Sequence, residues 1–244
     1  MFEAILFDLD GTLLDIDMNF FLTKYFGEMS KMAAISGCCD PGQLVTQILE
    51  STEVMIGDLN PRTRNEEVFM GHFFSRLKTD EIRMRAFFDD FYCTGFPRLQ
   101  EYCRPFQGIP QMMKKVFKEG YKVVIATNSV FPQKAIQTRL DWAGVGNFPY
   151  ELLTCYENMH YCKPHLQYYQ EIADNLGVEP AACLMVGNDT NEDLAAGKIG
   201  MKTFLVENCL IDQGNNTCRP DWRGSLQDFF KFIDDLRYNS VGQV

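Results

Sequence analysis

The feature that most constrains the fold of this chain is a set of four short apolar runs that alternate with helical patterns. The runs lie at residues 4–7, 123–126, 183–186 and 203–206. The helical patterns around them end near glycines, at Gly120, Gly144, Gly177 and Gly200. Short continuous apolar runs are typical of parallel strands covered on both faces. The alternation therefore predicts an α/β fold with a doubly wound, Rossmann-like parallel sheet, whose ligand site lies at the carboxyl ends of the strands.

The alternation is interrupted after the first strand by a stretch that reads as helix after helix. Apolar residues follow helical spacing there, and Asp40-Pro41, Asn60-Pro61 and Thr79 are candidate helix starts. We therefore expect an all-helical unit over residues 15–103, inserted into a core formed by residues 1–14 and 104–244. The phenylalanines of this unit are most simply explained as packing core, among them Phe73, Phe74, Phe87, Phe88 and Phe91.

Charge and composition narrow the partners and the compartment. A net charge of −10 argues against a nucleic-acid polymer as partner, because phosphate backbones select basic surfaces. No apolar run approaches the roughly 18 to 20 residues of a membrane span, and no signal peptide is recognisable, so we expect a cytoplasmic protein. Nine cysteines without a CxxC pair are then expected to be free thiols. The glycosylation pattern Asn215-Asn216-Thr217 carries little weight in such a protein.

Two carboxylates leave the first strand on the same side, at Asp8 and Asp10 of the segment Asp8-Leu9-Asp10-Gly11-Thr12. Acids commonly end strands and cap the following turn, so capping is the competing explanation for this pair taken alone. The second strand ends in Thr127-Asn128, which by itself fits an ordinary turn. The pair becomes informative only together with the other strand ends.

Two further segments add polar groups at the same edge of the predicted sheet. Lys163 precedes a helix, and the third strand ends in residues 187–193, Gly-Asn-Asp-Thr-Asn-Glu-Asp. Solvation of the lysine and capping by the acids would explain each segment separately. Taken together, the strand ends supply a carboxylate nucleophile, a second carboxyl for proton transfer, and a hydroxyl and an ammonium for phosphoryl oxygens. The distal acids suit Mg²⁺, which prefers oxygen ligands.

In this order, the segment from Asp8 to Thr12, Thr127, Lys163 and the pair Asp189 and Asp193 resemble the four motifs of the haloacid dehalogenase superfamily. The resemblance implies that Asp8 attacks phosphorus to form an aspartyl-phosphate. It implies that Asp10 protonates the leaving oxygen and later activates water. The inserted helices would correspond to the helical cap of that family, which closes over the site.

The same resemblance assigns the ligands. Thr127 and Asn128 would bind the phosphoryl group, and Lys163 would steady Asp8 and the transferred charge. Magnesium would be held by Asp8, by the backbone carbonyl of Asp10 and by Asp189. The resemblance also indicates a phosphatase or a phosphomutase. The transport ATPases of the family have threonine at the position of Asp10, and its dehalogenases lack that acid.

One departure from the family pattern concerns the metal. Many relatives have Gly-Asp where this chain has Gly187-Asn188. Alignment on the glycine puts Asn188 at the metal position, whereas alignment on the acid spacing puts Asp189 there and leaves Asn188 and Asp193 in support. We favour Asp189, because an ionised oxygen suits Mg²⁺ better than an amide.

The expected function is Mg²⁺-dependent hydrolysis of a small phosphorylated metabolite. A phosphomutase with the same core residues and a non-catalytic phospho-acceptor protein are the alternatives. The basic pairs Arg62/Arg64 and Arg83/Arg85 read as solvated helix faces, unless one of them meets a distal anionic group of the substrate. Cys155, His160, Cys162 and His165 do not match a closed zinc site. The sequence leaves the substrate and the oligomeric state open, a homodimer included.

Overall fold

The computed structural model describes residues 2–214 and 218–241, with side chains up to residue 236. Its main sheet has six strands in the order β5-β4-β1-β6-β7-β8, and every neighbouring pair is parallel. The strands are β1 (Ala4–Phe7), β4 (Lys122–Ile125), β5 (Leu152–Leu153), β6 (Cys183–Gly187), β7 (Lys202–Val206) and β8 (Trp222–Gly224). The predicted α/β class is confirmed, and each of the four apolar runs forms a strand of this sheet.

Helices cover both faces of the sheet because successive strand residues point to opposite sides. On β1, Ile5 and Phe7 pack in one cluster with α5, α6 and α8, while Ala4 and Leu6 pack in another with α7 and η4. The helices are α5 (Ile109–Lys118), α6 (Gln133–Trp142), α7 (Leu166–Leu176), α8 (Leu226–Val241) and the short 3₁₀ helices η3 (Pro180–Ala182) and η4 (Asp193–Ile199). This arrangement is the predicted doubly wound core.

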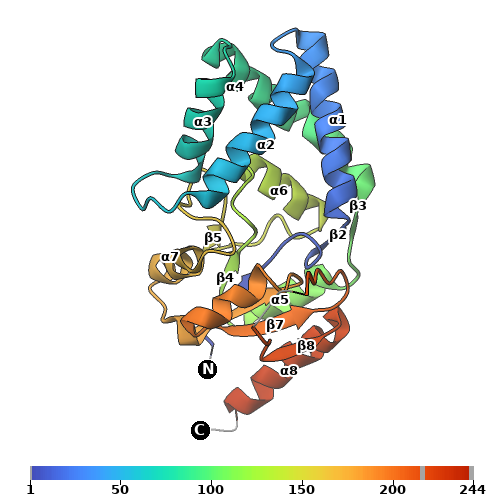
Figure 1. The fold of residues 1–244 in the computed structure, drawn as a ribbon. Coiled ribbons are helices and arrows are strands. Elements are labelled where there is room, and N and C mark those ends of the chain that lie inside the picture. Colours follow the sequence, from blue (N-terminus) through green and yellow to red (C-terminus); the bar gives the residue numbers. More distant parts are fainter. Residues whose placement is uncertain (1, 215–217, 242–244) are drawn as a thin grey trace.

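The helical insertion, as we call residues 18–102, stands apart from the sheet. It contains α1 (Met18–Ser36), α2 (Pro41–Gly57), α3 (Asn65–Arg76), α4 (Glu81–Asp90), the π-helix η1 (Phe91–Gly95) and the 3₁₀ helix η2 (Phe96–Tyr102). The chain enters and leaves it through β2 (Leu14–Ile16) and β3 (Cys103–Pro105), which pair antiparallel. Figure 1 shows α1 to α4 gathered at the end of the molecule opposite both chain ends. The division into folding units at residues 15–103 stays a prediction.

The helix starts of the insertion follow the predicted capping chemistry in part. Asp40 caps α2, its carboxylate accepting from the backbone N–H of Gln43. The expected start at Asn60-Pro61 is wrong, because the Asn60 side chain closes a local turn with Arg62 and Thr63 and α3 begins only at Asn65. The start near Thr79 lies one residue later, since Asp80 caps α4.

The remaining sequence signals have ordinary structural partners. His160 Nδ1 lies 2.6 Å from Glu171, and His165 Nε2 lies 2.8 Å from the carbonyl of Ile56, so these histidines are engaged in hydrogen bonds. Cys38 and Cys39 are free thiols. The pattern at residues 215–217 lies outside the described residues. Within the described chain, no helix has both the length and the hydropathy needed to cross a membrane.

Candidate active site

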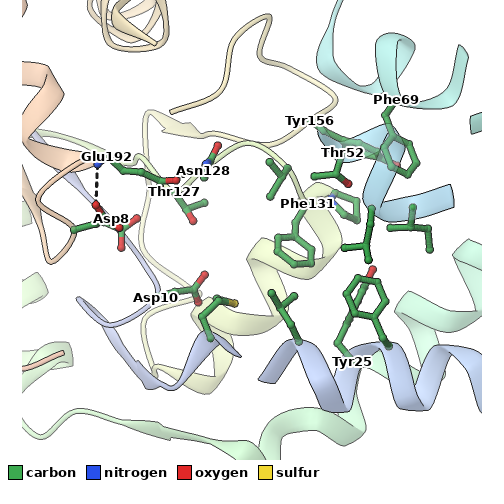
Figure 2. Close-up of a pocket in the computed structure, with 18 of the residues that line it drawn as sticks. Asp8, Asp10, Tyr25, Thr52, Phe69, Thr127, Asn128, Phe131, Tyr156 and Glu192 are labelled. Carbon is green, nitrogen blue, oxygen red and sulfur yellow. Dashed lines mark hydrogen bonds between the residues drawn. The ribbon is translucent and has the colours of Figure 1, made fainter. Parts of the chain in front are cut away.

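A cavity of about 330 Å³ opens between the carboxyl edge of the sheet and the helical insertion. Three strands deliver polar residues to its wall. Asp8 and Asp10 follow β1, and Thr127 and Asn128 follow β4. The residues that follow β6 are Asn188, Asp189, Glu192 and Asp193. Figure 2 shows the acids at one end of the cavity and the aromatic rings of Tyr25, Phe69 and Tyr156 at the other. The predicted location of the ligand site is therefore the location of a cavity.

Lys163 joins two of the carboxylates in the buried floor of the site. Its Nζ lies 2.9 Å from Asp8 Oδ1 and 2.6 Å from Asp193 Oδ1, and its side chain is fully buried. Burial raises the pKa of Asp8 to about 8, although the charge of Lys163 opposes this rise. Further positive charge close to Asp8 would favour its ionised form.

Asp10 has a different partner, Arg139, which lies on α6 and is fully buried. An ion pair joins Arg139 Nη1 to Asp10 Oδ2, and the guanidinium lies over the ring of Phe131 at 4.5 Å. Burial raises the pKa of Asp10, and Arg139 opposes the rise. The other oxygen, Asp10 Oδ1, is buried without a hydrogen-bond partner among the described residues. Arg139 thus fixes one oxygen of Asp10, whereas the second is buried and has no partner in the described chain.

Arg139 was not among the residues predicted from the sequence. A signal for it exists, because residues 135, 136, 139 and 140 have the spacing of one buried helix face. An arginine on such a face rarely stays unpaired. The spacing shows that Arg139 needs a buried partner, but it does not show that the partner is Asp10.

Asn128 connects the loops that carry Lys163 and the distal acids. Its Oδ1 accepts from the backbone N–H of Lys163 at 3.2 Å, and its Nδ2 donates to Glu192 Oε1 at 2.9 Å. Burial raises the pKa of Glu192 to about 7. The backbone carbonyl of Thr127 accepts from Thr154 and Tyr168, both at 2.7 Å, so the end of β4 is held while its side chain lines the cavity.

Asn188 is packed against the turn that follows β1. Its Oδ1 accepts from Thr12 Oγ1 at 2.9 Å, and its Nδ2 donates to the carbonyl of Cys209 at 2.6 Å. Gly11 allows this approach, because a Cβ there would lie 2.4 Å from Asn188 Nδ2 and the backbone has φ +83°. The amide of Asn188 is therefore held in place by the chain itself.

Asp189 has one carboxylate oxygen engaged in hydrogen bonds within its own turn. Its Oδ1 accepts from the backbone N–H groups of Asn191 and Glu192, at 2.7 and 2.9 Å. Both Asn188 and Asp189 line the cavity, so the assignment of Asp189 as metal ligand stays a prediction.

The donor set at this end suits a hard divalent cation, because it consists of carboxylate, amide and backbone oxygens. In the described part of the chain, no three side chains of His, Cys, Asp or Glu are arranged to hold a metal by themselves. The predicted set needs only two carboxylates, those of Asp8 and Asp189, since Asp10 would contribute its backbone oxygen. The lone oxygen of Asp10 and the raised pKa of Asp8 both fit a site that gains positive charge when it is loaded.

Every residue predicted for the site lies in or against this one cavity. Lys163 contacts Asp8 without lining the cavity itself. The other predicted residues line its wall: Asp8, Asp10, Thr127, Asn128, Asn188, Asp189 and Asp193. Their individual roles stay predictions.

Relatives of known or assigned function share the sequence at modest identity. The glyceraldehyde 3-phosphate phosphatase of Methanothermobacter thermautotrophicus is 25% identical over 218 residues, which cover 87% of this chain and 88% of that protein. The N-acetylmuramic acid 6-phosphate phosphatase of Pseudomonas aeruginosa is also 25% identical, over 88% of this chain and 85% of its own length.

Solved structures share the fold. A predicted phosphoglycolate phosphatase from Haemophilus somnus superposes with a TM-score of 0.58 at 19% identity, covering 95% of this chain and 97% of its own. An L-2-haloacid dehalogenase superposes equally well, at 0.58 and 15% identity, over 96% of this chain and 99% of its own. The family model of the haloacid dehalogenase-like hydrolases matches residues 2–199. The resemblance seen in the four motifs is thereby confirmed, and the chain belongs to the haloacid dehalogenase-like hydrolases.

Proposed function

We propose that this hydrolase is a phosphatase that cleaves phosphate monoesters through an aspartyl-phosphate on Asp8. The observation that carries the proposal is the presence of two carboxylates in one cavity with different partners, Lys163 for Asp8 and Arg139 for Asp10. Different surroundings allow one carboxylate to act as nucleophile and the other to exchange protons. The phosphatases among the relatives support the same reaction class.

In the first step, the Asp8 oxygen that Lys163 does not hold attacks phosphorus, and the bond from phosphorus to the leaving oxygen breaks. Protonated Asp10 gives its proton to that leaving oxygen, and the alcohol departs. Lys163 offsets negative charge on Asp8 and on the transferred group, while the Thr127 hydroxyl offers a hydrogen bond to a phosphoryl oxygen.

In the second step, the Asp10 carboxylate accepts a proton from a water molecule, whose oxygen attacks phosphorus. The bond between phosphorus and Asp8 breaks, which releases phosphate and regenerates both carboxyl groups. Arg139 has a positioning role in both steps, because its ion pair keeps Asp10 Oδ2 in place and leaves Oδ1 to exchange the proton.

A magnesium ion is the implied cofactor, held by Asp8, the backbone carbonyl of Asp10 and Asp189, with Asn188 and Asp193 in support. When bound, it would offset the repulsion between these carboxylates and the anionic phosphate. The cavity wall carries the acids Asp8, Asp10, Asp189, Glu192 and Asp193. Among the described residues, the cations paired with them are Lys163 and Arg139.

Asp10 also favours a phosphatase over a dehalogenase. A halide leaves without needing a proton, whereas an alcohol does need one. An acid held beside the nucleophile by a buried arginine is therefore of use to ester cleavage and of no evident use to carbon–halogen cleavage.

The test is phosphate release from a panel of phosphate monoesters, with Mg²⁺ and with a chelator, for the parent protein and for Asp8→Asn. We expect turnover that disappears with chelator and in the variant. Formation of an isomeric phosphate ester without free phosphate would indicate a phosphomutase. Stable phosphorylation without turnover would indicate a phospho-acceptor protein, and unchanged turnover in Asp8→Asn would refute the mechanism.

A further inference from the structure

We propose that the substrate is the phosphate monoester of a neutral, predominantly apolar alcohol, and that the cavity discriminates against leaving groups with a second anionic group. This inference rests on the proposed phosphatase function, which it extends to the substrate class. It is carried by the half of the cavity that faces the helical insertion.

That half is lined by hydrocarbon and aromatic side chains. They come from α1, α2, α3, α4, η1 and the loops after β4 and β5, and they are Met18, Leu22, Tyr25, Phe26, Ile48, Leu49, Phe69, Met70, Phe88, Tyr92, Val130, Phe131, Pro132 and Tyr156. Figure 2 shows Tyr25, Phe69, Phe131 and Tyr156 around the space that lies beyond Asp10 as seen from Asp8. Phosphorus bound at Asp8 would place the leaving group in this space.

No lysine, arginine or histidine is found among the described residues that line the cavity. The basic pairs of the insertion do not reach it. Arg83 donates to the carbonyls of Ser36 and Gly37, and Arg85 pairs with Glu81. A second anion in the substrate would therefore meet hydrocarbon at one end of the cavity and carboxylates at the other, without a cation to pair with.

The neutral polar groups of the wall are largely engaged with each other. The hydroxyls of Tyr25 and Tyr92 lie 2.8 Å apart in a hydrogen bond, and the Asn128 amide is bonded to Glu192 and Lys163. The hydroxyls of Thr52 and Tyr156 add two more polar groups. A sugar with several hydroxyls would lose its bonds to water and find few replacements, whereas an aromatic or branched hydrocarbon would fill the space.

The test compares three primary alkyl phosphates, so that intrinsic reactivity of the leaving oxygen is similar. They are 1-naphthylmethyl phosphate, phosphoglycolate and glucose 6-phosphate. We expect kcat/KM for the naphthylmethyl ester to exceed each of the others by about 100-fold or more, the size of discrimination that a few buried methylenes provide. Equal or higher kcat/KM for phosphoglycolate or for glucose 6-phosphate would overturn the inference and leave the phosphatase function standing.

A variant pair tests whether the wall causes the preference. Leu49→Lys places a cation at the cavity wall, and Leu49 is already 49% exposed, so the fold should tolerate it. Val54→Lys on the same helix, at a side chain that is 44% exposed and outside the cavity, is the control. We expect Leu49→Lys to reduce the preference for naphthylmethyl phosphate over phosphoglycolate at least tenfold, and Val54→Lys to leave it unchanged. The same change in both variants, or in neither, would contradict the inference.

Binding to Asp8→Asn separates this inference from the proposed reaction. Isothermal titration calorimetry of this variant with the same three esters, in the presence of Mg²⁺, should give the highest affinity for naphthylmethyl phosphate. We expect this even if the parent protein turns over no ester. In that case the reaction would be refuted and the apolar preference retained. Binding that is equal for the three esters, or tighter for phosphoglycolate, would refute the preference.

Discussion

The two ends of the cavity are built by opposite means. At the sheet end, carboxylates, an ammonium and a guanidinium are fixed by short hydrogen bonds and ion pairs, as Lys163 shows between Asp8 and Asp193. At the insertion end, side chains are fixed by packing, and charged groups are missing from the described wall. Figure 2 shows the carboxylates at one end and the aromatic rings at the other.

This difference separates two tasks. Electrostatic partners have to be in place before the reaction, since each buried charge without a partner is costly. An apolar wall imposes no such constraint, and its residues can change without disturbing the charges at the other end. The sheet end should therefore respond to substitution with lost turnover and stability, and the insertion end with altered selectivity.

The largest effect is expected for Lys163→Met. The change leaves Asp8 and Asp193 buried without their common cation, so we expect a loss of about 3–5 kcal/mol in the free energy of unfolding. We also expect kcat/KM to fall by about 100- to 1,000-fold. Urea unfolding and steady-state kinetics measure the two effects. The control is Lys202→Met, because Lys202 pairs with Asp221 on the surface at 50% exposure and should contribute under about 1 kcal/mol. Equal losses in the two variants would contradict the contrast between buried and exposed pairs.

A smaller effect is expected for Arg139→Met, which removes the partner of Asp10 but no residue of the described cavity wall. We expect kcat to fall by about 100-fold, the contribution of one positioned proton-transfer group, with KM nearly unchanged. Arg139→Lys should recover part of kcat, because it restores the charge. A rise in KM with kcat intact would instead assign Arg139 to substrate binding.

The smallest effect is expected for Asp221→Asn. Asp221 pairs with Lys202 at the surface, in contrast to the buried pair of Lys163 and Asp8. Burial acts to raise its pKa, but hydrogen bonds from Lys202 and Thr203 outweigh this and hold the pKa below its ordinary value of 3.8. A carboxyl with a lowered pKa stabilises the fold above its ordinary pKa, and this contribution is lost as the pH falls through the lowered value. Asp221→Asn should therefore cost under about 1 kcal/mol at pH 7, and the difference from the parent should shrink as the pH falls below 3.8 and vanish below the lowered pKa. Urea unfolding at a series of pH values would show a constant difference if this assignment were wrong.

Local sequence signals were sufficient for most of the fold. The run at residues 4–7 is β1 with the predicted bounds, and α6 ends at Trp142, close to the expected Gly144. Apolar runs between polar ends can be recognised without tertiary information. The failure at Asn60-Pro61 has a local cause, since an Asn side chain can close a turn as well as begin a helix.

The candidate site was also predictable only in part from the sequence. Asp8 and Thr127 could be located because parallel strands bring their carboxyl ends to one edge. Arg139 could not be assigned, because helical spacing predicts burial and does not name the partner across the cavity. Phe88 packs in the core as expected, and it also lines the cavity, which the sequence could not show because it does not give the distance between the insertion and the sheet.

The most direct test of the account is to look for phosphate on Asp8 itself. The parent protein would be mixed with Mg²⁺ and a turned-over ester, quenched in acid within milliseconds, and digested for mass spectrometry. The account predicts a phosphorylated peptide containing Asp8 that forms and decays at rates compatible with turnover, and that is missing in Asp8→Asn. Turnover without any such adduct, or an adduct on another residue, would contradict it.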